Sequence, residues 1–142
     1  MMSEAHSTEK VTVLKTAFII GAVADGVLAI EWFLISLGVV NLPVHPSFFV
    51  GSGQDFQYIL SVCALFMMGW ALLLYWGSAR PIERRGILLI TAVMLFAAIL
   101  SDYIIFSYLF SAQQIVLGSS VKFLLVFLFA GSYWHSLRVH GR

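Results

Sequence analysis

The chain has 142 residues, of which 61% are hydrophobic and only 11% are charged, and its formal net charge is +1. A soluble domain carries about 25% charged residues, so this composition excludes an independent soluble globule and a disordered chain. Without a long basic run the chain has no electrostatic surface for nucleic acid. The single cysteine, Cys63, excludes an internal disulfide framework and a multi-cysteine zinc site.

Four apolar stretches are long enough to cross a bilayer, which takes about 20 helical residues. They run approximately over residues 16–40, 56–76, 87–110 and 115–137. Each stretch is continuously apolar and does not alternate, which predicts membrane helices rather than the strands of a barrel. The expected fold class is therefore all-α: an integral membrane four-helix bundle that forms one domain over residues 1–142.

Positive charge is distributed unevenly between the two sides of the predicted bundle. Seven of the eight Lys and Arg residues lie before the first span, between the second and third, or after the fourth: Lys10, Lys15, Arg80, Arg84, Arg85, Arg138 and Arg142. Because positive residues stay on the cytoplasmic side of a membrane, we expect both termini in the cytoplasm. We expect the membrane to be the inner (plasma) membrane of a bacterium or an archaeon.

Two connections have distinct compositions. The connection Asn41–Asp55, NLPVHPSFFVGSGQD, contains Pro and Gly residues that forbid a continuous helix, and its apolar residues predict a loop at the membrane interface. The link Gly77–Gly86 contains Arg80, Arg84 and Arg85. Its main expected role is to set the topology, and its arginines could contact anionic lipid head groups.

Four charged residues lie within the predicted spans: Asp25 and Glu31 in the first, Asp102 in the third and Lys122 in the fourth. A charge at the bilayer centre costs about 2.5–3.5 kcal/mol on insertion scales. Helical rise places Glu31, Asp102 and Lys122 about 10–14 Å below the expected outer ends of their spans, so they can meet if their helices are neighbours. Asp25 lies about 9 Å from Glu31 along the helix axis and about 120° around it, which predicts different neighbours for the two acids.

Acids outnumber bases inside the spans. An ion pair of Lys122 with Asp102 or with Glu31 would neutralise one acid, and the others must be protonated, be hydrated, hold a cation or meet a donor from another subunit. Intramembrane acids of this kind serve proton relays and coupled transporters. The structural alternative is a buried Lys122–Asp102 pair that only fixes the register of two helices.

Polar residues near these charges predict the lining of a small cavity, and they could equally form hydrogen bonds between helices: Ser101, Tyr103, Ser107, Tyr108 and Ser119. In the first span, one stripe recurs every seven residues: Ala17, Ala24, Glu31 and Gly38. Small residues at such spacing let helices approach closely, so we expect Glu31 to face protein rather than lipid. The four histidines form no metal-binding pattern, and the cofactor, if any, stays open.

Two features of the chain resemble the small multidrug transporters: a short four-helix chain and a membrane glutamate in the first span, here Glu31 in AIEWFLISLG. The resemblance implies a transport role for Glu31. The residues around Glu31 and the strong charge bias differ from that family, so we assign none.

The favoured function is proton- or ion-linked transport of a small solute, as a transporter or channel subunit, with Glu31 and Asp102 as carriers and Lys122 as counter-charge. Four helices rarely enclose a pathway, so we expect a homo-oligomer or a larger membrane complex within the lipid bilayer. Two alternatives stay open. One is a non-catalytic accessory or assembly subunit of a membrane complex. The other is a membrane enzyme acting on a lipid or quinone with Asp102 or Glu31 as general acid–base.

Overall fold

The computed structural model of the chain describes residues 2–39, 53–105, 107–108 and 112–137. The regular elements in these ranges are four α-helices: α1 (Met2–Ser36), α2 (Gln54–Gly77), α3 (Gly86–Ile104) and α4 (Ala112–Leu137). Each helix contains a segment long and apolar enough to cross a membrane. The predicted all-α fold class with four membrane helices is confirmed.

Two helix ends differ from the predicted spans by more than five residues. α1 begins at Met2, long before the predicted start at Thr16, because the polar segment between them contains no Pro or Gly that would interrupt a helix. Within α1 only Val11–Ser36 is apolar enough to span a membrane. α3 ends at Ile104, whereas the predicted span continues to Phe110. Hydropathy marks the apolar stretch, not the point where helical hydrogen bonding stops.

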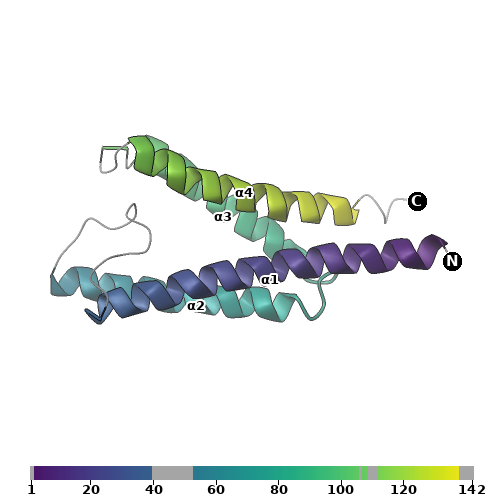
Figure 1. The fold of residues 1–142 in the computed structure, drawn as a ribbon, viewed down its shortest axis with the longest axis horizontal. Helices are drawn as coiled ribbons and strands as arrows, with labels where there is room; N and C mark the ends of the chain where they lie inside the picture. Colours follow the sequence, from purple (N-terminus) through teal and green to yellow (C-terminus); the bar gives the residue numbers. More distant parts are fainter. Residues whose placement is uncertain (1, 40–52, 106, 109–111, 138–142) are drawn as a thin grey trace.

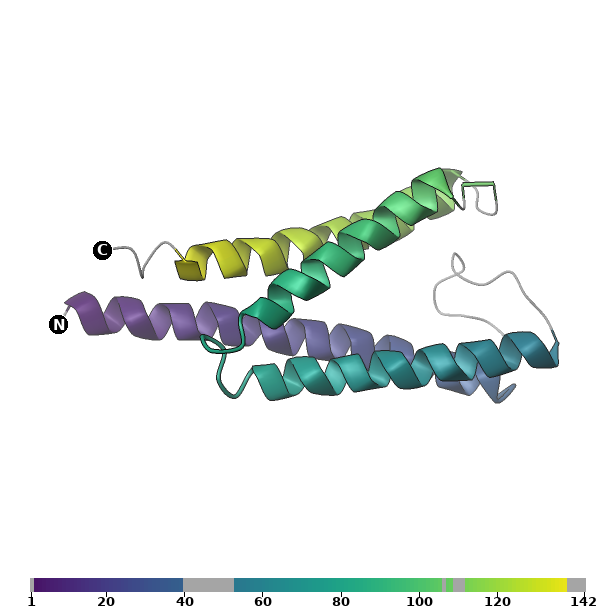
Figure 2. The same cartoon turned by 180° about the vertical axis from the view of Figure 1, so that it is seen from behind.

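The four helices form two antiparallel pairs (Figures 1 and 2). α1 lies along α2, α3 packs against α4, and the two pairs touch mainly through α1 and α4. The pairs meet near the α2–α3 link and diverge toward the opposite end. The start of α1 and the end of α4 lie at the same end as this link, which we call the link end (Figure 1).

A cluster of buried core residues lies in the half of the bundle next to the link end. All four helices contribute to it: Leu14, Ala17, Phe18, Leu74, Leu88, Ala92 and Phe129. Two glycines allow close approach there. A Cβ atom at Gly77 would lie 2.9 Å from Cδ1 of Phe18, and one at Gly21 would lie 2.8 Å from Cζ of Phe129. Both distances are shorter than van der Waals contact, so glycine at each position sets how closely α1 approaches α2 and α4.

Most of the remaining apolar surface faces outward. In the most apolar window of each span, only 17% to 22% of the residues are buried by the rest of the chain. A soluble protein rarely exposes contiguous apolar patches of this extent. Together with the length of the helices, this exposure indicates an integral membrane protein.

Candidate site at the intramembrane charges

An ion pair joins the two helices of the second pair. Lys122 of α4 donates a hydrogen bond from Nζ to Oδ2 of Asp102 in α3, and the two side chains are 18% and 21% exposed. The attraction between opposite charges is several times stronger in such a partly buried place than in water. The structure therefore brings together two of the predicted site residues, in one of the two pairings that the sequence allows.

A buried hydroxyl group lies close to this pair along α4. Ser119 precedes Lys122 by three residues, which places both on one side of the helix. Ser119 is only 2% exposed, and its Oγ atom has no hydrogen-bond partner among the described residues. The adjacent Ser120 instead donates to the carbonyl oxygen of Val116 at 2.7 Å, as serine in a helix commonly does. A polar region thus lies on the buried side of α4, formed by Ser119 and the ion pair.

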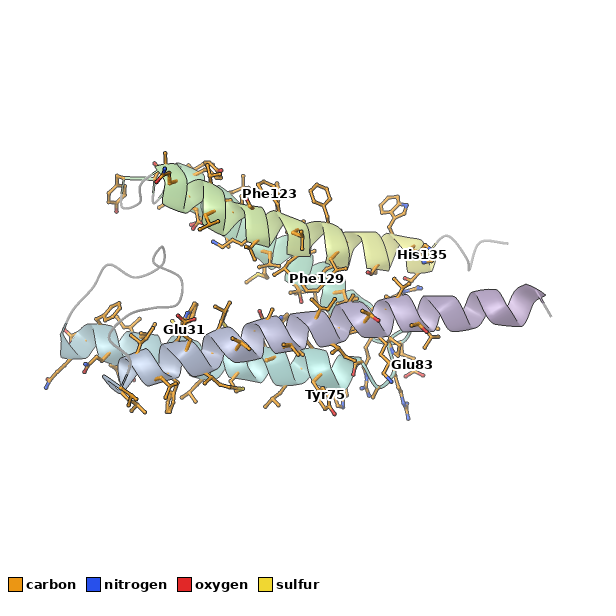
Figure 3. All side chains as sticks on the ribbon, in the orientation of Figure 1. Glu31, Tyr75, Glu83, Phe123, Phe129 and His135 are labelled. Atoms are coloured by element: carbon orange, nitrogen blue, oxygen red, sulfur yellow. The ribbon has the colours of Figure 1, made fainter. Side chains whose placement is uncertain are left out.

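Glu31 lies on α1 at the same level as this polar region. Its side chain points to the side of α1 that faces the α3–α4 pair (Figure 3), and the residue is half-buried. Gly21 of α1 packs against Phe129 of α4, and the two helices run antiparallel. Ten residues after Gly21 is Glu31, and ten residues before Phe129 is Ser119, so these two residues lie at a similar level. The level that the sequence predicts for Glu31 and Lys122 therefore agrees with the register of the helices.

Asp25 has different surroundings from Glu31, as the angle between them predicts. It follows Phe18 by seven residues and so lies on the same stripe of α1, whose Phe18 ring packs over Gly77 of α2. Asp25 is half-buried, and within the described part of the chain it has no hydrogen bond or ion pair. It is therefore an acid inside an apolar helix with no counter-charge from the described residues.

The residues predicted to line a cavity differ in their exposure. Ser101 is half-buried and Tyr103 is 47% exposed, while Ser107 and the 78% exposed Tyr108 lie in a turn beyond the end of α3. A shallow, largely apolar hollow of about 580 Å³ lies beside the first turns of α4, and it contains none of the five predicted lining residues. It is lined by Ala112, Gln113, Val116, Leu117 and Ser120.

Within the described ranges, no group of three or more His, Cys, Asp and Glu side chains is placed to hold a metal ion. Comparison with known proteins gives no match to a protein family, to a curated protein or to a solved structure. A functional assignment therefore depends on the arrangement of the charged residues in the spans.

Proposed function

We propose that the chain is a subunit of a proton- or cation-linked membrane transporter for a small solute. The proposal depends on the charge balance inside the spans. Lys122 neutralises Asp102, and Asp25 has no counter-charge among the described residues. Burying an isolated carboxylate in an apolar medium costs too much free energy for the charged form to persist. A bound proton or cation would therefore neutralise Asp25. Release of that proton or cation would be coupled to exposure of Asp25 to water.

The observation that carries this proposal is the position of Asp25 just beyond the buried core. Phe18, on the same stripe, lies where the helix pairs meet and is 0% exposed. Asp25 lies about 10 Å further along α1, past the α1 residues of the core cluster, Leu14, Ala17 and Phe18. A small change in the packing of α1 against α2 beyond the contact of Phe18 with Gly77 would change the access of water to Asp25 without breaking the core. Glu31 lies about 9 Å further along α1 and would be a second binding site for the same ion.

The roles of the other charged residues differ from the sequence-based hypothesis. Asp102 is engaged by Lys122, so we assign this pair to holding α3 on α4. Glu31 stays a carrier, and Asp25 takes the place of Asp102 as the other. Because each span buries few of its residues within the chain, a pathway would need further subunits. We therefore propose that the transporter is a homo-oligomer.

Reconstitution into lipid vesicles that contain a pH-sensitive dye tests the proposal. A potassium diffusion potential set with valinomycin, negative inside, drives protons inward. In a parallel experiment the same potential drives Na⁺ into vesicles that contain a sodium-sensitive dye instead. We expect ion entry above that of empty vesicles for the natural chain. Asp25→Asn should reduce the entry to the level of empty vesicles. The matched control is Asp55→Asn, which removes an exposed acid in the first turn of α2 and should leave the flux unchanged.

Two results would remove the proposal. One is a natural chain that conducts no more than empty vesicles with either ion. The other is a folded Asp25→Asn variant that conducts as well as the natural chain. Circular dichroism of the reconstituted variants confirms that each is folded before its flux is compared.

A second candidate is a non-catalytic assembly subunit of a larger membrane complex. The limited burial of every span favours it, because a lipid-exposed surface of this size could equally be covered by other chains. Native mass spectrometry of particles extracted in mild detergent separates the two candidates. A particle made only of copies of this chain supports the transporter, and a fixed stoichiometric partner chain supports the assembly subunit.

A further inference from the structure

The link between α2 and α3 is a folded basic turn with fixed backbone geometry. The backbone N–H of Arg80 donates to the carbonyl of Gly77 at 3.2 Å, and that of Arg84 donates to the carbonyl of Arg80 at 3.1 Å. Pro81 within the turn is buried. The turn therefore fixes the backbone positions of the arginines in the link.

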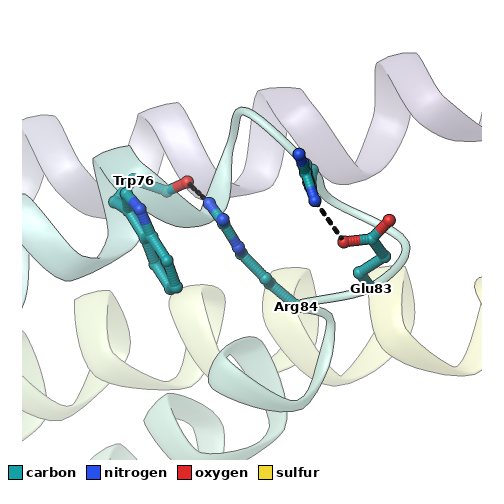
Figure 4. A network of polar contacts seen from close by, with 4 residues as sticks. Trp76, Glu83 and Arg84 are labelled. Atoms are coloured by element: carbon teal, nitrogen blue, oxygen red, sulfur yellow. Dashed lines mark hydrogen bonds and ion pairs between the residues drawn. The ribbon is translucent and has the colours of Figure 1, made fainter.

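The three arginines of the link have different surroundings. Arg80 pairs with Glu83 at 3.4 Å, and both side chains are 67% exposed. Arg84 donates to the carbonyl oxygen of Trp76 and lies with Cζ 3.2 Å from the centre of the Trp76 ring (Figure 4). Nη1 of Arg85 is buried, yet it has no hydrogen-bond acceptor among the described residues. The acid in the link is thus occupied by Arg80, while a guanidinium nitrogen of Arg85 lacks an acceptor.

The depth of the link in the membrane follows from the end of α2. Tyr75 and Trp76 are 67% and 54% exposed, and exposed Trp and Tyr side chains at a span end lie at the level of the lipid head groups. The link follows them directly, so its arginines lie at the level of the lipid phosphates. Two of the first amides of α3, those of Ile87 and Leu88, already donate to carbonyl oxygens of the link. The main donors to a ligand would therefore be the arginine side chains.

We propose that this link is a binding site for the phosphate group of an anionic phospholipid. Arg85, which is half-buried and has a guanidinium nitrogen without an acceptor among the described residues, supplies one positive charge, and Arg84, held against Trp76, supplies the second. The planar guanidinium group matches phosphate oxygens in a two-point geometry. An anionic lipid is preferred over a zwitterionic one, because Glu83 is occupied by Arg80 and offers no separate partner for a choline or an amine. This site is independent of the proposed transport function.

Native mass spectrometry of the full chain in detergent tests the site. The ligands are phosphatidylglycerol, phosphatidylcholine and inorganic phosphate, each titrated separately. We expect the phosphatidylglycerol complex to be about fivefold tighter than the phosphatidylcholine complex, and Arg85→Gln to weaken phosphatidylglycerol binding about fivefold, which corresponds to ~1 kcal/mol for one basic residue near a membrane surface. Arg85→Lys keeps the charge but loses the two-point geometry, and it should also weaken binding.

Arg80→Gln is the matched control, since it removes the same charge from the same turn at an arginine already paired with an acid. It should weaken binding less than Arg85→Gln does. Equal weakening by the two variants would indicate diffuse electrostatic attraction and overturn the site. Inorganic phosphate that displaces the lipid at equal concentration would overturn the assignment to a lipid. If Arg85→Gln does not fold, Arg85→Lys and Arg80→Gln provide the same comparison, and equal affinities would overturn the site.

Discussion

The ring of Phe18 in α1 packs over Gly77, the last residue of α2, so closely that a single methyl group at Gly77 would overlap the ring. This contact lies at the link end, where the two helix pairs meet. Gly21, one turn further along α1, makes a similar contact with Phe129 of α4. The two glycine contacts together hold α1 between α2 and α4, and they define the core beyond which Asp25 and Glu31 lie.

Gly77→Ala should therefore destabilise the bundle. The added methyl would push against a fully buried aromatic ring, and overpacking of this kind costs about 1–3 kcal/mol. Gly69→Ala is the matched control on the same helix, because no atom lies within 4 Å of a Cβ placed there. Alanine has the higher helix propensity, so that variant should be neutral or slightly stabilising. Unfolding in mixed micelles measures both changes, and equal destabilisation by the two would contradict the packing argument.

Asp102→Leu should destabilise the contact of α3 with α4, because it leaves the Lys122 ammonium group in a mostly buried place without its acid. Breaking a fully buried pair costs about 3–5 kcal/mol. Since these side chains are 18% and 21% exposed, we expect about 2 kcal/mol. The double variant with Lys122→Leu should recover most of this loss of stability, since neither charge of the pair then remains. A double variant no more stable than Asp102→Leu would argue against the ion pair as the source of the effect.

The fold class could be predicted from the sequence because the bilayer imposes it: four long apolar stretches must form helices. The pairing of the helices could not be predicted, because apolar residues surround each span and do not indicate which neighbour a given face contacts. The level of Glu31 was predictable from helical rise, whereas the hydrogen bond from Nζ of Lys122 to Oδ2 of Asp102 depends on the packing of α3 against α4.

The contact between Trp76 and Arg84 could not be predicted from the sequence either. The two residues are eight positions apart and are joined by a turn, so helical periodicity does not relate them. A Trp at the end of a span followed by arginines signals the membrane interface, but not which arginine stacks on the ring. The end of α3 at Ile104 was missed because the chain stays apolar beyond it.

Thr91→Val should weaken the contact between α2 and α3. Nε1 of Trp70 donates to Oγ1 of Thr91 at 3.2 Å, and the same hydroxyl group donates to the carbonyl oxygen of Ile87 at 2.8 Å. Valine keeps the shape but leaves the indole N–H without its acceptor, which costs about 1 kcal/mol. Thr91→Ser, which keeps the hydroxyl group, should cost less. Unfolding free energies of the two variants check this order, and a valine variant as stable as the serine variant would contradict it.

Chemical modification of carboxyl groups should distinguish Asp25 from Asp102. Dicyclohexylcarbodiimide is an apolar reagent that enters membranes and requires a protonated carboxyl group, whose proton it takes before the oxygen attacks the reagent. Asp102 is engaged by the Lys122 ammonium group, so it should react slowly. Asp25 has no such counter-charge among the described residues, and if it carries a proton, it should be the first of the two to react. Mass spectrometry of proteolytic fragments locates the adduct.

The modification of Asp25 by the carbodiimide should depend on pH in one direction. Raising the pH removes the proton that the reagent needs, so modification of Asp25 should fall as the pH rises. Lys122→Leu removes the ammonium group that engages the Asp102 carboxyl group and should make Asp102 reactive as well. Asp55, exposed in the first turn of α2, is the control for an acid in contact with water and should stay unmodified. Modification of Asp102 before Asp25 in the natural chain would show that the carrier role belongs to the paired acid instead.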